Sequence, residues 1–358
     1  MRTILLNPGP VSLSQGVRKA VAGVDLCHRE PEYFDLQDRV LNQLLAVYQL
    51  DAAAWTPVLL GGSGTTSVEA IMSSLVPRNG RVLVLENGVY GERLTRLVEI
   101  HGISHTSMAH DWLDAWDMDR LNSLVTTGSF THVAAVHHET TTGRLNPVNQ
   151  LAGLCERTGV RLLLDAVSSF GAEAIDFESP ALSACALTAN KCLHGIPGLC
   201  VAMVRNSELA VPVQPPRSMT LNLAHWAEHQ QRRSTPFTPP VNSLLALDQA
   251  LKELHEQGGW KARQAHYRRL ADRVAIRLAA RGVVELIPAE ASSCVLRAHR
   301  VPAGKSYAAI HDALKLRGFV IYAGQGALAE EIFRISTMGE IGDHDIERLL
   351  SALDDVFS

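Results

Sequence analysis

A single lysine lies in the stretch "LTANKCLHGIPG", residues 187–198, in which no other Lys, Arg, Asp or Glu occurs. Lys191 follows a short apolar run that predicts a buried strand, and its neighbours are small or apolar. Desolvation at such a place disfavours the ammonium form and leaves the amine available for a Schiff base. A lysine that reaches solvent at the rim of the sheet is the alternative.

An aspartate ends another apolar run. Asp165 follows "VRLLL", residues 160–164, and precedes Lys191 in the chain. A carboxylate at the end of a buried strand needs a partner, because an unpaired buried charge is costly. That partner could be a structural arginine, or it could be the protonated ring nitrogen of a cofactor.

A glycine-rich turn follows a third apolar run. The stretch "GGSGTTSVEAIMSSL" begins at Gly61 and turns directly into a helical pattern. Glycines let the backbone approach an anion, and the first helical turn exposes unpaired N–H groups beside the hydroxyls of Ser63 and Thr65. The stretch matches neither the P-loop nor the dinucleotide fingerprint. It predicts an anion site, with a simple Ser/Thr-capped helix as the alternative.

These three features belong together because ligands of open α/β sheets collect at the carboxyl ends of the strands. A phosphate cradle, an aspartate for a pyridinium nitrogen and a Schiff-base lysine are the groups that pyridoxal phosphate requires. Tyr90 in "ENGVYGER" could stack on the ring, and Thr140 in "HHETTTGRLNP" could reach its phenolic oxygen or a substrate. A core tyrosine and a Thr-rich turn are the alternatives.

The elements that must position these residues alternate along most of the chain. Apolar runs of strand length alternate with helical patterns, which predicts an α/β fold with a mostly parallel sheet. We expect a large domain over residues 1–250 and a smaller C-terminal α+β domain over 251–358, with the N-terminal segment packed on the smaller domain. The predicted strands of the large domain are 57–62, 81–88, 131–139, 160–166, 185–190 and 198–204.

Composition narrows the class of protein. The 358 residues carry 33 Lys and Arg against 37 Asp and Glu, without long runs of one sign, so we expect no nucleic-acid partner. The six cysteines form no CxxC pair and no zinc-type cluster with histidine, so we expect no metal and a reducing, cytoplasmic setting. No apolar stretch approaches the roughly 20 residues that span a bilayer, so we expect no membrane association.

The motifs also resemble a known family. The stretches "NPGP", "GGSGTTSVEA", "NGVYGER", "HHETTTGRLNP", "LLLDAVSSFG", "TANKCLHGIPG", "PFTPP" and "FRISTMGEIG" occur in the order typical of the class V aminotransferases of fold type I. The resemblance covers nearly the whole chain. It implies a pyridoxal-phosphate-dependent fold with a large and a small domain.

The resemblance implies a role for each matching residue. Lys191 would bind the cofactor covalently, Asp165 would hold its ring nitrogen, and Asn190 lies beside the lysine in the same motif. Thr238 would reach the phosphate of a neighbouring subunit, which implies a homodimer, and Arg334 would bind the anionic group of the substrate. The remaining cofactor contacts would come from Ser63, Gly64, Thr65, Tyr90 and Thr140.

The resemblance is strongest to family members that transfer the amino group of 2-aminoethylphosphonate to pyruvate, giving phosphonoacetaldehyde and L-alanine by a ping-pong mechanism. Gln325 departs from this pattern, since the phosphonate enzymes tend to carry a lysine there. Three alternatives therefore stay open. These are another aminotransferase of the class, acting on alanine or serine with glyoxylate or pyruvate or on a different aminophosphonate; a pyridoxal-phosphate-dependent lyase; and a binding protein without catalysis.

Overall fold

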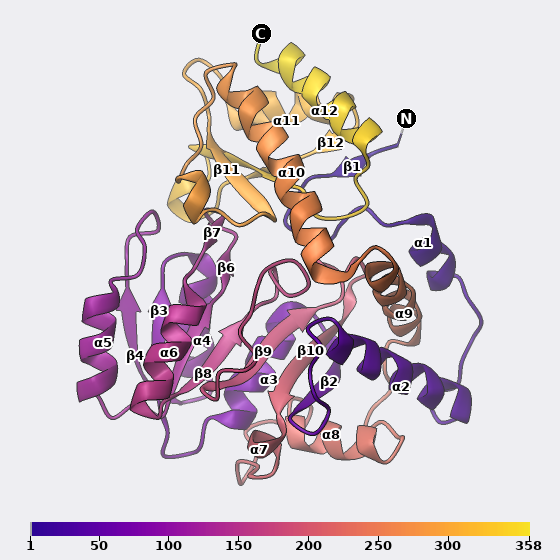
Figure 1. The fold of residues 1–358 in the computed structure, drawn as a ribbon, viewed down its shortest axis with the longest axis vertical. Coiled ribbons are helices and arrows are strands. Elements are labelled where there is room, and N and C mark those ends of the chain that lie inside the picture. Colours follow the sequence, from indigo (N-terminus) through magenta and orange to yellow (C-terminus); the bar gives the residue numbers. More distant parts are fainter. Residues whose placement is uncertain (1) are drawn as a thin grey trace.

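The computed structural model describes residues 2–358 and is built around a seven-stranded sheet (Figure 1). All neighbouring strands are parallel except for β10, which runs antiparallel to both of its neighbours. The mostly parallel α/β sheet predicted from the sequence is thereby confirmed. In spatial order the strands are β2 (Trp55–Gly62), β10 (Gly198–Arg205), β9 (Leu182–Thr188), β8 (Arg161–Asp165), β5 (His132–Val136), β3 (Arg81–Glu86) and β4 (Ser104–Ala109).

Helices cover both faces of this sheet, which explains why its strands read as continuous apolar runs. Alternate strand residues belong to two separate core clusters, with Leu162 and Leu164 in one and Leu163 in the other. The first cluster is closed by α2 (Pro31–Ala46), α5 (Met118–Thr127), α6 (Val148–Thr158) and α9 (Val241–Glu256). The second is closed by α3 (Gly64–Leu75), α4 (Val89–Ile100) and α8 (Leu223–Gln231).

A smaller α+β domain lies above the sheet in Figure 1. Its three-stranded antiparallel sheet has the order β11–β14–β13, and the N-terminal strand β1 pairs in parallel with β12. The N-terminal segment thus lies beside strands that follow it by about three hundred residues. The elements are β1 (Ile4–Leu5), α10 (Gly259–Ala279), β11 (Leu296–Arg300), α11 (Tyr307–Leu316), β12 (Phe319–Val320), β13 (Tyr322–Ala323), β14 (Ile332–Ser336) and α12 (Asp343–Val356).

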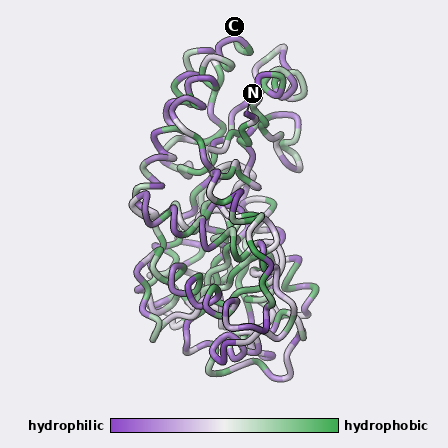
Figure 2. Tube along the Cα trace, turned by 90° about the vertical axis from the view of Figure 1, so that its right-hand side faces the viewer, coloured by the Kyte–Doolittle hydropathy of each residue, from purple (hydrophilic) through white to green (hydrophobic). Residues whose placement is uncertain are grey.

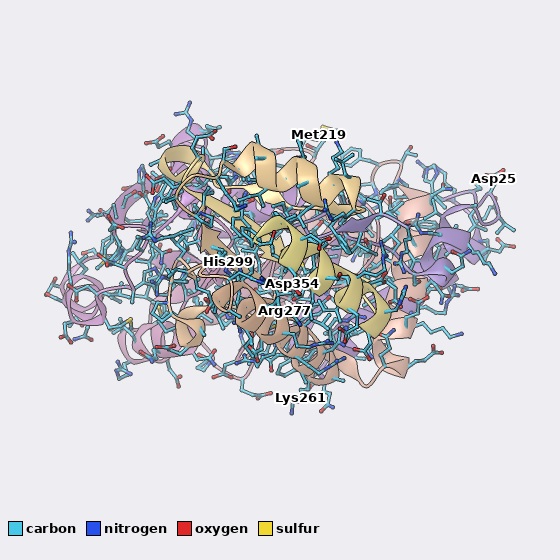
Figure 3. The ribbon with its side chains drawn as sticks, turned by 90° about the horizontal axis from the view of Figure 1, so that it is seen from above. Asp25, Met219, Lys261, Arg277, His299 and Asp354 are labelled. Atoms are coloured by element: carbon cyan, nitrogen blue, oxygen red, sulfur yellow. The ribbon has the colours of Figure 1, made fainter. Side chains whose placement is uncertain are left out.

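Ion pairs join the two long helices of the small domain. Arg277 of α10 and Asp354 of α12 lie next to each other in Figure 3, and Arg269 and Arg273 pair with acidic residues of α12 in the same way. These side chains are at least partly exposed, so each pair contributes little. Apolar packing in the core of the small domain provides most of the stability there. Figure 2 shows hydrophobic segments, in green, that run through the interior of the large domain.

Some elements were not anticipated. The edge strand β4, "SHTSMA", is partly exposed and mostly polar, so it lacks the apolar run that marks the central strands. The short helices α1 (Gln15–Val21), α7 (Asn206–Leu209) and α8 were also missed. The strand predicted over 131–139 is divided into β5 and β6 (His138–Glu139), and β6 forms an unanticipated hairpin with β7 (Arg144–Leu145). The domain boundary near residue 250 stays a prediction; α9 spans it, and α10 begins at Gly259.

Within residues 2–358, no helix is long and apolar enough to cross a bilayer.

Candidate active site

Two of the predicted site residues come from adjacent parallel strands. Asp165 is the last residue of β8, and Lys191 lies three residues beyond the end of the neighbouring strand β9. The glycine turn at the start of α3 lies against the turn that follows Asp165. A Cβ atom on Gly64 would lie 2.5 Å from Cγ1 of Val167, in the turn that follows Asp165. The fold therefore brings the predicted phosphate cradle, aspartate and lysine to the same edge of the sheet.

Lys191 is enclosed by the N-terminal segment. Its Nζ donates a hydrogen bond to the carbonyl of Pro8, and a Cβ atom on Gly9 would lie 2.8 Å from Lys191 Cδ. Gly9 has a φ of +111°, a conformation that favours glycine. The pKa of Lys191 is lowered from its usual 10.5 to about 8, mainly by burial and in smaller part by the charge of Arg334, while Asp165 opposes the shift. A substantial share of this lysine is therefore neutral at physiological pH.

Asp165 is partly buried and has no cation beside it. Its Oδ1 accepts a hydrogen bond of 3.0 Å from the backbone N–H of Val167, and no arginine, lysine or histidine nitrogen of residues 2–358 lies within 4 Å of it. Burial raises its pKa, although this hydrogen bond and the charge of Lys191 act in the opposite direction. The structural arginine considered as its partner is thus not in contact with it.

Arg93 joins the phosphate cradle to Tyr90. Its Nη1 donates a hydrogen bond of 3.2 Å to Thr65 Oγ1, and its guanidinium carbon lies 4.6 Å from the centre of the Tyr90 ring. The cradle itself is an ordered turn, in which Ser63 N donates to Thr66 Oγ1 at the start of α3. Arg93 was missed in the sequence, because its position one helical turn after Tyr90 gives no sign that it points toward another element.

Glu139 fixes the backbone of Tyr90. This carboxylate is fully buried and accepts hydrogen bonds from the backbone N–H groups of Tyr90 and Gly91, at 3.1 and 3.2 Å, at the start of α4. Its second oxygen accepts from the backbone N–H and the hydroxyl of Thr141. Burial raises the pKa of Glu139 to about 7 against the effect of these donors. From the sequence this residue was noted only as part of a Thr-rich turn.

The same turn contacts Arg334. The Arg334 guanidinium is 2% exposed and donates to the carbonyls of Ala323 and Thr140, each at 2.8 Å. It also donates to Gln325 Oε1 at 3.0 Å, and no carboxylate of residues 2–358 lies within 4 Å of it. Thr140 Oγ1 is buried and makes no hydrogen bond within the described chain. A buried cation and a buried hydroxyl are thus left for a ligand to satisfy.

Two further predicted residues are placed differently. Asn190 precedes Lys191, and its side-chain oxygen accepts a hydrogen bond of 2.8 Å from Thr188 Oγ1, which stabilises the end of β9. Thr238 is exposed in the segment between α8 and α9, and no hydrogen bond links it to the other predicted site residues within residues 2–358. The suggested role of Thr238 at a neighbouring subunit stays a prediction.

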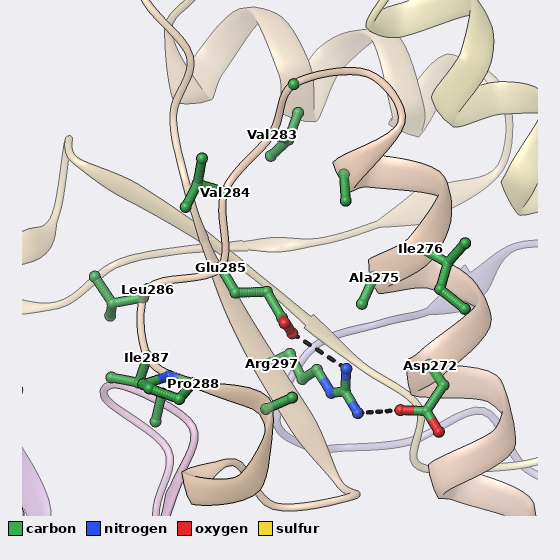
Figure 4. Close-up of a pocket in the computed structure, with 13 residues that line it drawn as sticks. Asp272, Ala275, Ile276, Val283, Val284, Glu285, Leu286, Ile287, Pro288 and Arg297 are labelled. Atoms are coloured by element: carbon green, nitrogen blue, oxygen red, sulfur yellow. Dashed lines mark hydrogen bonds and ion pairs between the residues drawn. The ribbon is translucent and has the colours of Figure 1, made fainter.

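One large cavity is separate from these residues. It measures about 830 Å³ and lies on the small domain between α10 and residues 282–289 (Figure 4). Its walls are mostly apolar, and Arg297 forms ion pairs there with Asp272 and Glu285. Its lining contains none of the residues at the ends of β8 and β9. The charge of Arg297 is thus neutralised by these two carboxylates, in contrast to that of Arg334.

Comparisons with known proteins place this arrangement in a family. The family model described as "Aminotransferase class-V" matches residues 49–340. The chain belongs to the class V aminotransferases. It is 35% identical to a 2-aminoethylphosphonate–pyruvate transaminase of Klebsiella pneumoniae, over 98% of this chain and 96% of the relative. It is also 35% identical to one of Pseudomonas putida, over 99% and 96%.

Solved structures agree with the family assignment. This class V aminotransferase superposes on a pyridoxamine-pyruvate aminotransferase of Mesorhizobium loti with a TM-score of 0.90 and 26% identity, over 99% of this chain and 92% of the other. An aspartate aminotransferase of Thermus thermophilus gives a TM-score of 0.90 and 25% identity, over 99% of both chains. The protein is therefore an aminotransferase, as its motifs predicted, and the possibility of a non-catalytic binding protein is not favoured.

Proposed function

We propose that this aminotransferase uses pyridoxal phosphate to transfer the amino group of 2-aminoethylphosphonate to pyruvate. The observation that carries the proposal is Arg334, a buried cation with no carboxylate partner in the described chain. Its planar fork suits a carboxylate or a phosphonate. The names of the relatives supply the choice of donor and acceptor.

The residues around Lys191 fit the proposed cofactor. The start of α3 offers unpaired N–H groups and the hydroxyls of Ser63 and Thr65 to a phosphate. Asp165 lacks a protein cation and could pair with a protonated ring nitrogen, while Thr140 Oγ1 lacks any partner and could reach a ring oxygen. When bound there, pyridoxal phosphate supplies an electron sink for the carbanion of the amino donor.

The chain contributes proton transfer, charge and orientation. The lowered pKa of Lys191 leaves its amine able to take a proton from the substrate carbon. The same amine would then give this proton to C4′ of the cofactor. Asp165 would keep the ring nitrogen protonated, and Tyr90, fixed by Glu139, would cover one face of the ring. Arg334 would hold each anionic substrate in turn, since the donor and the acceptor both carry an anionic group.

Gln325 bears on which anion Arg334 prefers. Its amide oxygen accepts from Arg334 Nη1 at 3.0 Å, so it orients the guanidinium without adding a positive charge. A carboxylate needs one such cation, whereas a phosphonate dianion is better balanced by two. Another class V aminotransferase reaction, with an amino acid such as alanine or serine as donor, is therefore the second candidate, but the names of the relatives do not favour it.

We also propose a cytoplasmic homodimer. The exposed Thr238 lies in a proline-rich segment close to the cradle, where a Cβ atom on Gly61 would lie 3.6 Å from Pro240 Cδ. A second chain could therefore receive Thr238 at its own phosphate site. Sedimentation of the purified protein tests the dimer, and a Thr238→Ala variant tests whether cofactor affinity depends on it.

The function is tested by offering the purified protein 2-aminoethylphosphonate with pyruvate and measuring alanine. We expect alanine to form, and to be absent with Lys191→Ala, which should stay folded and lose the visible absorbance of the bound cofactor. Activity with serine or alanine as donor, and none with the phosphonate, would refute the proposed donor. Release of ammonia or carbon dioxide without pyruvate would instead indicate a lyase.

A further inference from the structure

His194 has an unusual backbone conformation close to the reactive lysine. Its φ is +66°, in the left-handed region that non-glycine residues seldom adopt, and it lies three residues after Lys191. Its backbone N–H donates to the Lys191 carbonyl at 3.0 Å, so both residues belong to one tight turn. Backbone outliers of this kind persist only where surrounding contacts enforce them.

Those contacts come from the small domain. The backbone N–H of Gly339 donates to His194 Nε2 at 3.0 Å, so Nε2 carries no proton, and its single lone pair is shared between this N–H and the hydroxyl of Tyr267. Tyr267 is fully buried in α10, and its ring stacks on the imidazole. One helical turn earlier in α10, Arg263 donates to the carbonyl of Cys192 at 2.6 Å. The small domain thus contacts the lysine turn at two successive points.

The same contacts lead to the substrate arginine. Gly339 follows β14, the strand that carries Arg334, and Thr337 between them donates to the carbonyl of Cys294 at 3.0 Å. The path from the lysine to the arginine therefore consists of one short turn, one hydrogen-bonded imidazole and one strand end. A cavity of about 290 Å³ lies beside His194 and Tyr267, so these polar contacts are not surrounded by tight packing on every side.

We propose that His194 is a positioning residue, through which Tyr267 and Gly339 of the small domain fix the Lys191 turn relative to Arg334. This inference rests on the role proposed for Lys191. A substrate anion bound by Arg334 would then be held at a set distance from the amine. Losing the imidazole contacts would disturb both the lysine environment and the binding of anionic substrates.

Two substitutions of His194 separate this proposal from simple backbone preference. Asparagine tolerates the left-handed region better than glutamine, but its side chain is too short to reach the Nε2 position. Glutamine can place Oε1 near Nε2 and accept from Tyr267 and Gly339. If the contacts matter, His194→Gln should retain more activity than His194→Asn. If only the backbone matters, the order should be reversed, and the proposal is wrong.

The variants are compared as holoenzymes by two measurements that stability alone does not change. The first is the pH at which the visible absorbance of the bound cofactor changes, and the second is KM for the anionic substrates against kcat. We expect Tyr267→Phe and His194→Asn to shift the absorbance midpoint and to lower kcat/KM by about tenfold, as loss of one buried hydrogen bond allows. Gln49→Asn, at an exposed residue with a φ of +57°, should change neither.

The outcomes distinguish this inference from the proposed function. A wild-type protein without cofactor absorbance would overturn the role of Lys191 and with it the proposed function. A wild-type protein with the absorbance, together with His194 and Tyr267 variants that change only the melting temperature, would overturn the positioning role alone.

Discussion

The pKa of Lys191 leads to a quantitative prediction about how fast the apoenzyme takes up its cofactor. Burial lowers this pKa to about 8, against the usual 10.5. At pH 7.5 about a quarter of the Lys191 amines would be neutral, compared with about one in a thousand for an ordinary lysine. Since only the neutral amine attacks a carbonyl, attachment at this pH should be roughly 200-fold faster than for an ordinary amine of equal access.

The direction of the shift can be tested with two charge variants. Asp165 raises the pKa of Lys191, and Arg93 lowers it. Removing the anion with Asp165→Asn should therefore move the midpoint of the pH–rate profile to lower pH. Removing the cation with Arg93→Gln should move it to higher pH. Opposite shifts from two neutralising substitutions are expected only if both charges act on the amine.

The measurement is the initial rate of the absorbance change after apoenzyme and pyridoxal phosphate are mixed, followed from about pH 6 to 10. A lysine derivative blocked at its α-amino group serves as the reference amine and accounts for ionisation of the cofactor itself. We expect a midpoint near 8 for the wild type. A midpoint close to that of the reference amine would refute the reasoning, because it would mean that Lys191 is well solvated.

Three other predictions follow from the contacts around the site. Gly64→Ala would place a Cβ atom 2.5 Å from Val167 Cγ1, so equilibrium titration should show that cofactor affinity falls by about tenfold or more. The control Gly61→Ala, whose Cβ atom would have only one contact at 3.6 Å, should change the affinity little. Glu139→Gln leaves two donors without an acceptor, so urea unfolding should show a loss of about 2 kcal/mol; an unchanged midpoint would contradict this. Arg334→Lys keeps the charge but loses the fork, so KM for anionic substrates should rise by about 10- to 100-fold with a smaller change in kcat.

The central fold and the order of its chemical groups were accessible from the sequence because both depend on local patterns. A strand buried on both faces must be apolar throughout, so β5, β8 and β9 were evident. Asp165 and Lys191 stand directly after such runs, and the sheet topology places strand ends together. The edge strand β4 could not be found this way, because partial exposure removes the apolar pattern that identifies a strand.

The remaining parts of the site depend on contacts between segments far apart in the chain. Glu139 caps α4, which begins some fifty residues earlier, and no spacing rule connects the two. Tyr267 meets His194 across the domain junction, at a sequence separation of 73 residues. The proximity of Gly9 to Lys191 also requires the N-terminal segment to pair with β12 near the other end of the chain. Such contacts follow only from the assembled fold.

The charged side chains of the site are held by neutral groups, which leaves their charges available to a ligand. Its carboxylates are satisfied mainly by N–H and hydroxyl groups, Asp165 by Val167 and Glu139 by the start of α4 and Thr141. Its cations are held by neutral oxygens instead, since Arg334 donates to two carbonyls and an amide, and Lys191 donates to the carbonyl of Pro8.

Direct ion pairs between these groups would have neutralised them, as Arg297 is neutralised on the small domain. A carbonyl orients a guanidinium without cancelling its charge, so the attraction for an incoming anion is preserved at low dielectric. The hydrogen bond from the backbone N–H of Val167 likewise stabilises the charged form of Asp165, the form that would pair with a protonated ring nitrogen. The Gln325→Glu substitution would place a carboxylate beside Arg334. It should therefore weaken the binding of anionic substrates, because the new carboxylate would neutralise the charge of the guanidinium.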